Sequence, residues 1–183
     1  MASTHQGPPA VSLATTHELI TCRPAVSAAE LAEHHAIRHE VFVNEQKVFS
    51  GSDRDAHDRG DAVIHLLGRC GDTPAGAVRL FPVDETGRLW QGDRLCVLPG
   101  FRTRGLGAPL VRCAVASAGA RGGTRMIAHI QLPNVRFFTH LGWRPEGDAE
   151  IYAGREHQRM VTELPSPSDG ARIERELFAG VCH

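Results

Sequence analysis

The feature that most constrains the fold is the stretch Asp93–Gly107, whose pattern is that of a strand, a tight loop and the start of a helix. Leu95–Leu98 is a short apolar run that ends at a Pro-Gly pair, which is typical of a strand covered on both faces. A helical pattern begins at Leu106. Between them, Arg102-x-x-Gly105-x-Gly107 places small residues where backbone N–H groups and the positive end of a helix can meet an anion. The stretch therefore predicts a pyrophosphate-binding loop.

Two familiar phosphate-binding loops do not fit this stretch. A Walker loop requires Gly-Lys-Ser/Thr, and no lysine follows Gly105 or Gly107. A dinucleotide fingerprint requires a third glycine, and none stands three residues after Gly107. Because glycine also serves turns and helix starts for conformational reasons alone, the rest of the chain has to support the interpretation.

Strands and helices are expected on both sides of this loop. Apolar runs predict strands over residues 18–22, 62–67, 76–81 and 126–130, the middle two as an antiparallel hairpin, and a last hairpin over 151–160. Helices are expected over 28–42, opened by a capping box of Ser27 and Glu30, over 106–120 and over 134–141. We expect a flexible leader over residues 1–16, one domain over 17–164, and a C-terminal tail over 165–183 with a short charged helix.

Length and composition fit a single domain with an ordinary core. The chain has 183 residues and 42% hydrophobic content. Its net charge of −1 gives no electrostatic case for nucleic acid or an anionic membrane. No signal or membrane-spanning segment is evident, and the five scattered cysteines form no Cys-x-x-Cys pair. The sequence thus predicts a cytoplasmic protein that binds neither nucleic acid nor a membrane.

Two motifs, in the same order, resemble the GNAT (GCN5-related) N-acetyltransferase family. Arg102-x-x-Gly105-x-Gly107 after a strand resembles its acetyl-CoA motif, and Phe137-Phe138-x-x-Leu141-Gly142-Trp143 resembles the segment that packs beside the coenzyme. The order Arg38-x-x-Val41-Phe42-Val43-x-Glu45-Gln46 resembles the opening of a subgroup related to acyl-homoserine lactone synthases. The nearest likeness is the bacterial nitrogen-starvation-associated GNAT group. The resemblance spans residues 18–160.

The resemblance implies a fold, a reaction and a set of donor contacts. The fold is α/β (α+β), a mixed, mostly antiparallel twisted sheet of roughly six to seven strands flanked by about four helices, with a V-shaped splay between the two central strands. The reaction is transfer of the acetyl group of acetyl-CoA to a primary amine of a small metabolite, by direct attack in a ternary complex, with no metal. A homodimer is possible. The implied donor contacts are Leu95, Cys96, Val97, Arg102, Thr103, Arg104, Gly105, Leu106, Gly107, Asn134 and Phe138.

The proton-transfer residues are less determined than the donor contacts. A lysine-like amine has a pKa of ~10.4, so a base must deprotonate it. We place Glu45 first among the candidates, then His157 and His129, with His65 also open. Phe138 stands where the family commonly has a general-acid tyrosine and cannot donate a proton, so it should be a packing residue. The only tyrosine, Tyr152, and His157 are the substitutes that the resemblance offers.

Two further features leave alternatives open. The loop over residues 50–61 is dense in carboxylates and is either a solvated connection or a platform that orients a substrate amine. Its Asp53-x-Asp55-x-x-Asp58 spacing also resembles lactone synthases, which use S-adenosylmethionine, and Phe138 keeps a non-catalytic acyl-CoA-binding sensor or accessory protein in view. His35 and His39 are four residues apart and could share a metal, but no third ligand is evident, so no metal is predicted.

Overall fold

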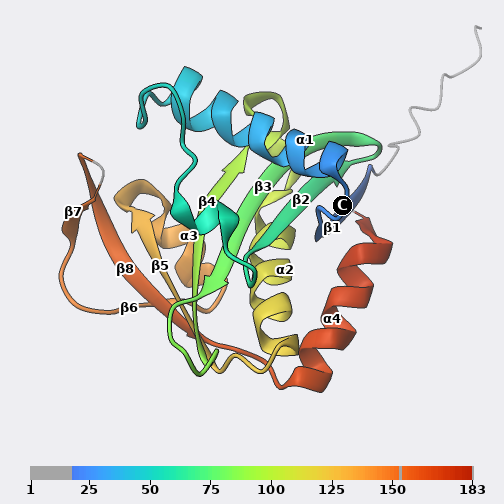
Figure 1. Cartoon of the computed structure of the whole chain (residues 1–183), viewed down its shortest axis with the longest axis vertical. Helices are drawn as coiled ribbons and strands as arrows, with labels where there is room; N and C mark the ends of the chain where they lie inside the picture. Colours follow the sequence, from blue (N-terminus) through green and yellow to red (C-terminus); the bar gives the residue numbers. More distant parts are fainter. Residues whose placement is uncertain (1–17, 153, 183) are drawn as a thin grey trace, which may run out of the picture.

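The computed structural model describes residues 18–152 and 154–182, so the leader expected over residues 1–16 lies outside the described part. Nine strands form one sheet in the order β6-β8-β5-β4-β3-β2-β1-β9, with β7 paired to β8 (Figure 1). Every pairing is antiparallel except that of β4 with β5, which is parallel. The expected mixed, mostly antiparallel sheet is confirmed.

The bounds of the elements follow the sequence patterns closely in the middle of the chain. The strands are β1 (Leu19–Pro24), β2 (Ile64–Cys70), β3 (Thr73–Pro82), β4 (Leu89–Val97), β5 (Arg125–Gln131), β6 (Arg144–Pro145), β7 (Glu150–Tyr152), β8 (Arg155–Glu163) and β9 (Val181–Cys182). The α-helices are α1 (Ala28–His39), α2 (Gly107–Ala120), α3 (Val135–His140) and α4 (Pro167–Ala179). The strand count exceeds the expected six to seven because three of these strands have only two or three residues.

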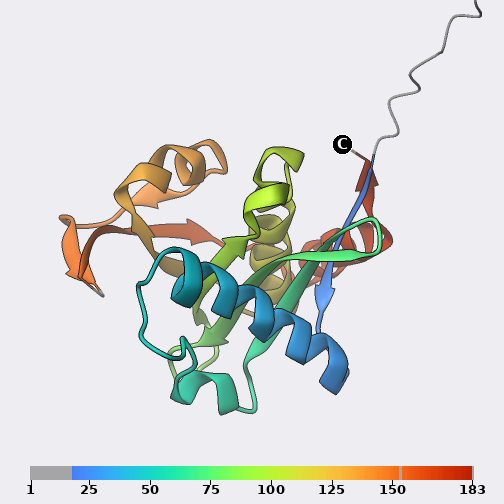
Figure 2. The same ribbon diagram turned by 90° about the horizontal axis from the view of Figure 1, so that it is seen from above.

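The helices lie on both faces of the sheet. Helix α1 crosses one face, and α2 and α4 lie side by side on the other, as the view from above shows (Figure 2). The larger core lies between α2 and the sheet, where Leu66, Leu80 and Leu110 are completely buried. A smaller apolar cluster under α1 includes Ile37 and Val41. Helices therefore cover both faces of the sheet.

Strands β4 and β5 separate partway along their length. Their pairing covers only Leu89–Gln91 against Arg125–Ile127, although β4 runs on to Val97 and β5 to Gln131. Beyond that point neither strand has the other as a ladder partner, which is the expected splay. The structure therefore opens a gap inside the sheet rather than at its edge.

A β-bulge distorts β4 where the gap opens. Ala77 pairs with Cys96 and Arg79 pairs with Asp93, so one residue of β3 opposes two residues of β4, Arg94 and the next one along. Arg94 has a φ of 53°, in the left-handed region that residues with side chains seldom adopt. A bulge leaves its extra residue outside the ladder. The expected local distortion of this strand is present.

Helix α1 begins as the sequence indicates and ends differently. Ser27 and Glu30 form the expected capping box, with Ser27 Oγ accepting a hydrogen bond from the Glu30 N–H. The regular helix stops at His39 and continues as a π-helical turn, η1 (Glu40–Glu45). Such turns are rare and often lie beside functional sites. This one delivers the chain to the mouth of the gap between β4 and β5, where Gln46 contributes to its lining.

Two expectations are corrected. The central strand starts at Leu89 instead of Leu95, and Trp90 belongs to it and is buried, because residues 89–91 pair with β5. The segment beyond residue 165 contains the expected helix, but it packs against the domain and is not a separate tail. Helix α4 packs so closely on α2 that a Cβ at Gly170 would lie 2.5 Å from the Ala120 nitrogen, and β9 pairs with β1.

Candidate active site

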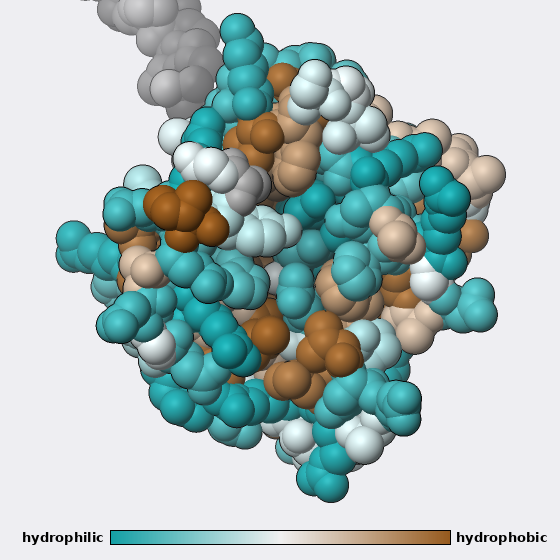
Figure 3. Space-filling view, turned by 60° about the vertical axis from the view of Figure 1, so that its left-hand side comes forward, coloured by the Kyte–Doolittle hydropathy of each residue, from teal (hydrophilic) through white to brown (hydrophobic). Residues whose placement is uncertain are grey.

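A cleft occupies the gap between β4 and β5. It encloses about 1020 Å³ of space between protein atoms, a volume that includes open solvent at its mouth. Its lining comes from η1 and the loop after it, from β4, β5, α2 and α3, and from the β7–β8 hairpin. Figure 3 shows one side of the molecule as a mostly hydrophilic surface with separate hydrophobic patches. The cleft is the natural place to look for the chemistry.

Three of the four expected catalytic side chains line this cleft together. His129 comes from β5, Tyr152 from β7 and His157 from β8. The Tyr152 ring stacks on His129 with a centroid distance of 5.5 Å and meets His157 edge-on at 5.4 Å. The β7–β8 hairpin and its pairing with β5 thus bring residues 129, 152 and 157 to one place.

The hydrogen bonds of the two histidines distinguish their roles. His157 is 6% exposed, and its Nδ1 lies 2.9 Å from the Arg155 carbonyl oxygen. A carbonyl can only accept, so Nδ1 carries the proton and Nε2 is left with a lone pair. His129 Nδ1 lies 2.8 Å from Glu150 Oε1, at ion-pair distance but without hydrogen-bond alignment. His157 is therefore the side chain best prepared to accept a proton.

Phe138 is buried at the inner wall of the cleft. It is 5% exposed and meets Trp143 edge-on at 5.4 Å. The expectation that it is a packing residue is confirmed. Tyr152 is 44% exposed, and among the residues that the structure describes it is the one tyrosine in the cleft.

Glu45 lies at the rim and not among the histidines. Both of its carboxylate oxygens accept hydrogen bonds from Arg102, at 2.7 and 2.5 Å, and Arg102 Nε also donates to the Val97 carbonyl at 3.1 Å. These hydrogen bonds lower the pKa of Glu45 below its usual range. A carboxylate so stabilised is a weaker base, and Glu45 is better suited to hold Arg102 than to deprotonate an amine.

The expected donor loop has the geometry of an anion site. Residues Pro99–Arg104 form a short 3-10 turn, Gly105 has a φ of 79°, and α2 begins at Gly107 with no acidic residue in its first turn. The first N–H groups of α2 have no intrahelical partners. Arg102, Thr103 and Arg104 are exposed around this helix end.

The other expected donor contacts divide into two groups. Cys96 and Leu106 are buried in the core, so only their backbones can reach a ligand. Leu95 and Asn134 line the cleft, whereas Val97 is half-buried and offers its carbonyl to Arg102.

The described cysteine side chains are unsuited to act as nucleophiles. All four are buried, and burial raises the pKa of each thiol, in Cys96 and Cys113 to about 12. A thiol with such a pKa is protonated at neutral pH, and the nucleophile is the thiolate. Among the described residues, no cysteine is placed to carry an acyl group.

Three carboxylates of the acidic loop, those of Asp53, Asp55 and Asp58, are already paired. Arg38 Nε lies 2.6 Å from Asp53 Oδ2 and Arg38 Nη1 lies 2.5 Å from Asp58 Oδ1. Arg79 Nη1 lies 2.6 Å from Asp55 Oδ1. We name this assembly the buried charge network; its members are Arg38, Arg79, Arg94, Asp53, Asp55, Asp58 and Asp93.

These three carboxylates are therefore not a free platform for an amine, because arginines of the protein itself occupy them, whereas most other residues of the loop are exposed, as expected of a solvated connection. Sequence reasoning missed this role of Arg79 and Arg94. The sequence does contain a signal for a buried ion pair, since Arg79 interrupts an otherwise apolar strand. Its partners could not be identified from a local pattern, because they lie 14 and 24 residues away in the chain.

This fold and this site match a known family. Residues 28–143 match the acetyltransferase (GNAT) family. The chain belongs to it. Among curated proteins, the uncharacterized N-acetyltransferase YjcF of Bacillus subtilis is 29% identical over 140 residues, which cover 76% of this chain and 96% of YjcF.

Solved structures share the GNAT fold. A Lactobacillus plantarum protein assigned as an N-acetyltransferase superposes with a TM-score of 0.70 at 25% identity, covering 80% of this chain and 99% of that one. The CoA-dependent acyl-homoserine lactone synthase BjaI superposes with a TM-score of 0.65 at 18% identity, covering 85% and 89%, a likeness that shows the fold alone.

GNAT proteins use acetyl-CoA or another acyl-CoA as donor, and the residues of this chain fit such a molecule. The left-handed Gly105 and the free N–H groups at the start of α2 suit a pyrophosphate, and the cleft leads inward from the bulge of β4. In the described part of the chain, no helix has the length and apolar character that a bilayer crossing requires.

Proposed function

We propose that this GNAT protein transfers the acetyl group of acetyl-CoA to a primary amine of a small metabolite, by direct attack while both substrates are bound. The observation that carries the proposal is that the bulge of β4 and the lone pair of His157 serve one cleft. The bulge would bind the thioester of the donor, and the His157 lone pair would accept a proton from the incoming amine.

The base in this proposal is His157 Nε2. An amine attacks only when it is neutral, so the ammonium proton has to leave before or during attack. The Arg155 carbonyl fixes the His157 tautomer with Nε2 unprotonated, so that this nitrogen can accept the proton. His129 and its neighbour Glu150 provide a negative site that favours a cationic acceptor.

The bulge of β4 supports the carbonyl carbon during attack. The amine nitrogen first bonds to the carbonyl carbon, which places negative charge on the carbonyl oxygen; the C–S bond then breaks as the carbonyl re-forms and the thiolate leaves. An N–H freed from the ladder at Arg94–Leu95 can donate to that oxygen, a contribution often worth several kcal/mol in acyl transfer.

The departing sulfur takes a proton last. Phe138 has no proton to give, and Tyr152 is the hydroxyl that lines the cleft. Direct attack also agrees with the cysteines, since those that the structure describes are buried and protonated. A covalent acyl-enzyme on one of them would require a thiolate that burial disfavours.

The test is a calorimetric titration with acetyl-CoA followed by a thiol-release assay over a panel of primary amines. We expect binding at micromolar ligand and thiol release with at least one small amine. Absence of acetyl-CoA binding at millimolar ligand would contradict the proposal. Binding without thiol release from any amine would favour the acyl-CoA sensor instead.

The same panel tests the lactone-synthase alternative. Incubation with acyl-CoA and S-adenosylmethionine should release no methylthioadenosine, whereas release would assign the chain to that class. Placement in the nitrogen-starvation-associated group, a role in nitrogen metabolism and a cytoplasmic location are further predictions. Reporter fusions grown with and without ammonium would test them.

A further inference from the structure

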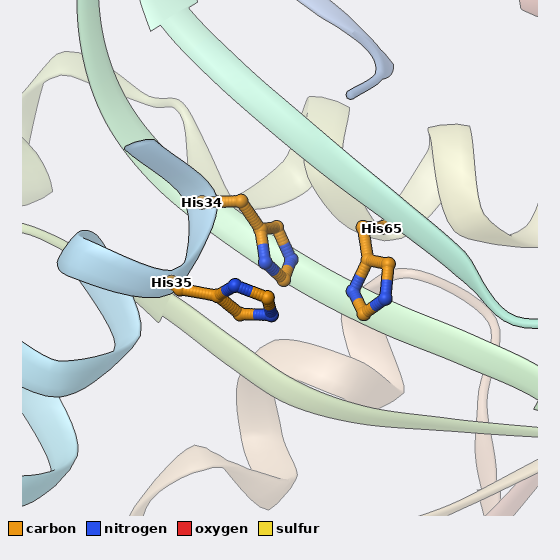
Figure 4. Close-up of side chains that lie close together, drawn as sticks. All are labelled: His34, His35 and His65. Carbon is orange, nitrogen blue, oxygen red and sulfur yellow. The ribbon is translucent and has the colours of Figure 1, made fainter. Parts of the chain in front are cut away.

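Three histidines converge at a second place, away from the cleft. His34 and His35 come from α1 and His65 from β2, and one ring nitrogen of each lies within 4.8 Å of the other two. Figure 4 shows the three rings facing a common space between helix and strand. His34 is completely buried and His65 is 9% exposed. We call them the histidine trio.

The trio presents nitrogens without hydrogen-bond partners. Among the described residues, His34 Nδ1, His35 Nε2 and His65 Nδ1 are buried and accept or donate no hydrogen bond. His34 Nε2 lies 3.4 Å from the Val78 carbonyl oxygen, which can only accept, so Nε2 holds the proton and Nδ1 holds a lone pair. Leaving such buried polar atoms unsatisfied destabilises the folded state. The space between them therefore calls for a bound partner.

Charges of both signs lie near the trio. Asp58 Oδ1 lies 3.8 Å from His35 Nε2 and favours a cation there, whereas the guanidinium of Arg38 opposes one. The lone pair on His34 Nδ1 is in the form that binds metal ions.

Of the positive groups that oppose an ion, Arg54 is able to move away. Arg54 Nη2 contacts His35 Nδ1, which fixes the proton of His35 on Nε2, the atom that faces the trio. Arg54 is exposed and can swing into solvent. If it does, the His35 proton can move to Nδ1 or be released.

We propose that His34, His35 and His65 bind a divalent transition-metal ion, Zn²⁺ in preference, which ties α1 to β2. Three imidazoles and a water form a tetrahedral zinc site. At a Zn–N distance of about 2.1 Å the nitrogens stand about 3.4 Å apart, so side-chain rotation has to bring them about an ångström closer. His39, the partner that spacing along the helix favoured, is exposed and takes no part.

The test uses the full chain after treatment with a chelator. Titration with Zn²⁺ and with Co²⁺ should show one site, a rise in thermal midpoint on Zn²⁺ and a visible Co²⁺ absorption band. His35→Asn should weaken Zn²⁺ binding at least tenfold, whereas the matched control His39→Asn should bind as the unaltered protein does. Arg54→Gln should bind several-fold more tightly.

The proposal fails if Zn²⁺ binds no more tightly than millimolar, or if H35N and H39N bind it equally. In the first case the space between the rings holds water or is empty. Because His35 is partly exposed, H35N should fold, and far-ultraviolet circular dichroism verifies this before the titration. His65→Asn serves as an independent second variant, with the same loss expected.

Discussion

In the cleft, His157 and Tyr152 face a space that a substrate can enter, whereas beneath α1 the guanidiniums of Arg38 and Arg79 are completely buried against carboxylates. Both places gather charged and titratable side chains from distant parts of the chain. In the cleft, Nδ1 of His157 is hydrogen-bonded to the Arg155 carbonyl, and Nε2 is left to accept a proton. In the buried charge network, the carboxylates are paired with arginines of the protein itself. Residue type alone does not tell a catalytic cluster from a structural one; the partners do.

The largest effect should follow from removing the free nitrogen of His157. In His157→Asn the side-chain amide can still donate to the Arg155 carbonyl, but no base remains, so we expect kcat to fall roughly 10²–10⁴-fold with the fold retained. Thiol release with the best amine measures this. The control His140→Asn changes an exposed histidine on α3 and should stay near full activity. More than a tenth of the activity in H157N would remove His157 from its proposed role.

The next effect should appear as lost stability in the network. Arg38→Met leaves Asp53 and Asp58 buried without their cation, and breaking one partner of a buried pair costs about 3–5 kcal/mol. Urea denaturation measures this. Arg23→Met removes an exposed arginine paired with Glu30 and should cost less than about 1 kcal/mol. Equal losses in the two variants would mean that the network adds nothing that a surface pair does not.

A pH-dependent effect should distinguish the trio from the cleft. His34 has a pKa of about 2 in the folded protein, because burial and the neighbouring His65 and Arg38 disfavour its charge, against about 6.5 when unfolded. The unfolded chain thus binds more protons than the folded protein below pH 6.5. This residue should therefore lower the free energy of unfolding by about 1.4 kcal/mol for each unit that the pH falls. Its contribution is fully present above pH 6.5 and decreases toward pH 2. Urea midpoints between pH 7 and 4.5 measure the slope.

The variant His34→Gln should flatten this slope by about one proton, and His35→Gln provides a second test if H34Q does not fold. Asp58 of the buried charge network loses its contribution to stability at a lower pH than His34 does. Arg38 and Arg79 hold the pKa of Asp58 well below its usual range, so that contribution is lost only as the pH falls below about 4. An unchanged slope in both variants would mean that these histidines are already charged in the folded protein.

The smallest effect concerns the rim of the cleft. Glu45 and the donor compete for Arg102, so Glu45→Gln should tighten acetyl-CoA binding by roughly two- to fivefold, the size expected of an exposed ion pair. Calorimetry measures it. Glu18→Gln is the matched control variant, because Glu18 forms an ion pair with Arg104 on the same loop. If E45Q instead weakens binding, Glu45 orients Arg102 for the donor and does not restrain it.

The sequence was most informative where local pattern decides structure. The capping box of Ser27 and Glu30, the loop ending at Gly107 and the helix after it are all present, because each depends on neighbours within a few residues. His129, Tyr152 and His157 were each candidates from the sequence and the family resemblance, but that they form one cluster was not predicted. Their meeting depends on the pairing of β5 with β8, which no local pattern encodes.

What could not be predicted depends on contacts between distant residues. The start of β4 at Leu89 requires its pairing with β5, and the partners of Arg79 come from two other segments. The histidine trio shows the same limit. Spacing along the helix suggested His35 with His39, but side chains also meet across elements, and β2 supplies His65 instead.

The splay between β4 and β5 has one more consequence. Unpaired strand edges on the outside of a sheet invite other chains to add to them, and proteins protect such edges. Here the two open edges face each other inside the sheet, past Gln91 and Ile127, and not on its outside. What can enter is a single thin molecule that carries amides of its own, such as the pantetheine arm of coenzyme A. The sheet would then be completed by its substrate, and its halves should become more rigid only when the donor is bound.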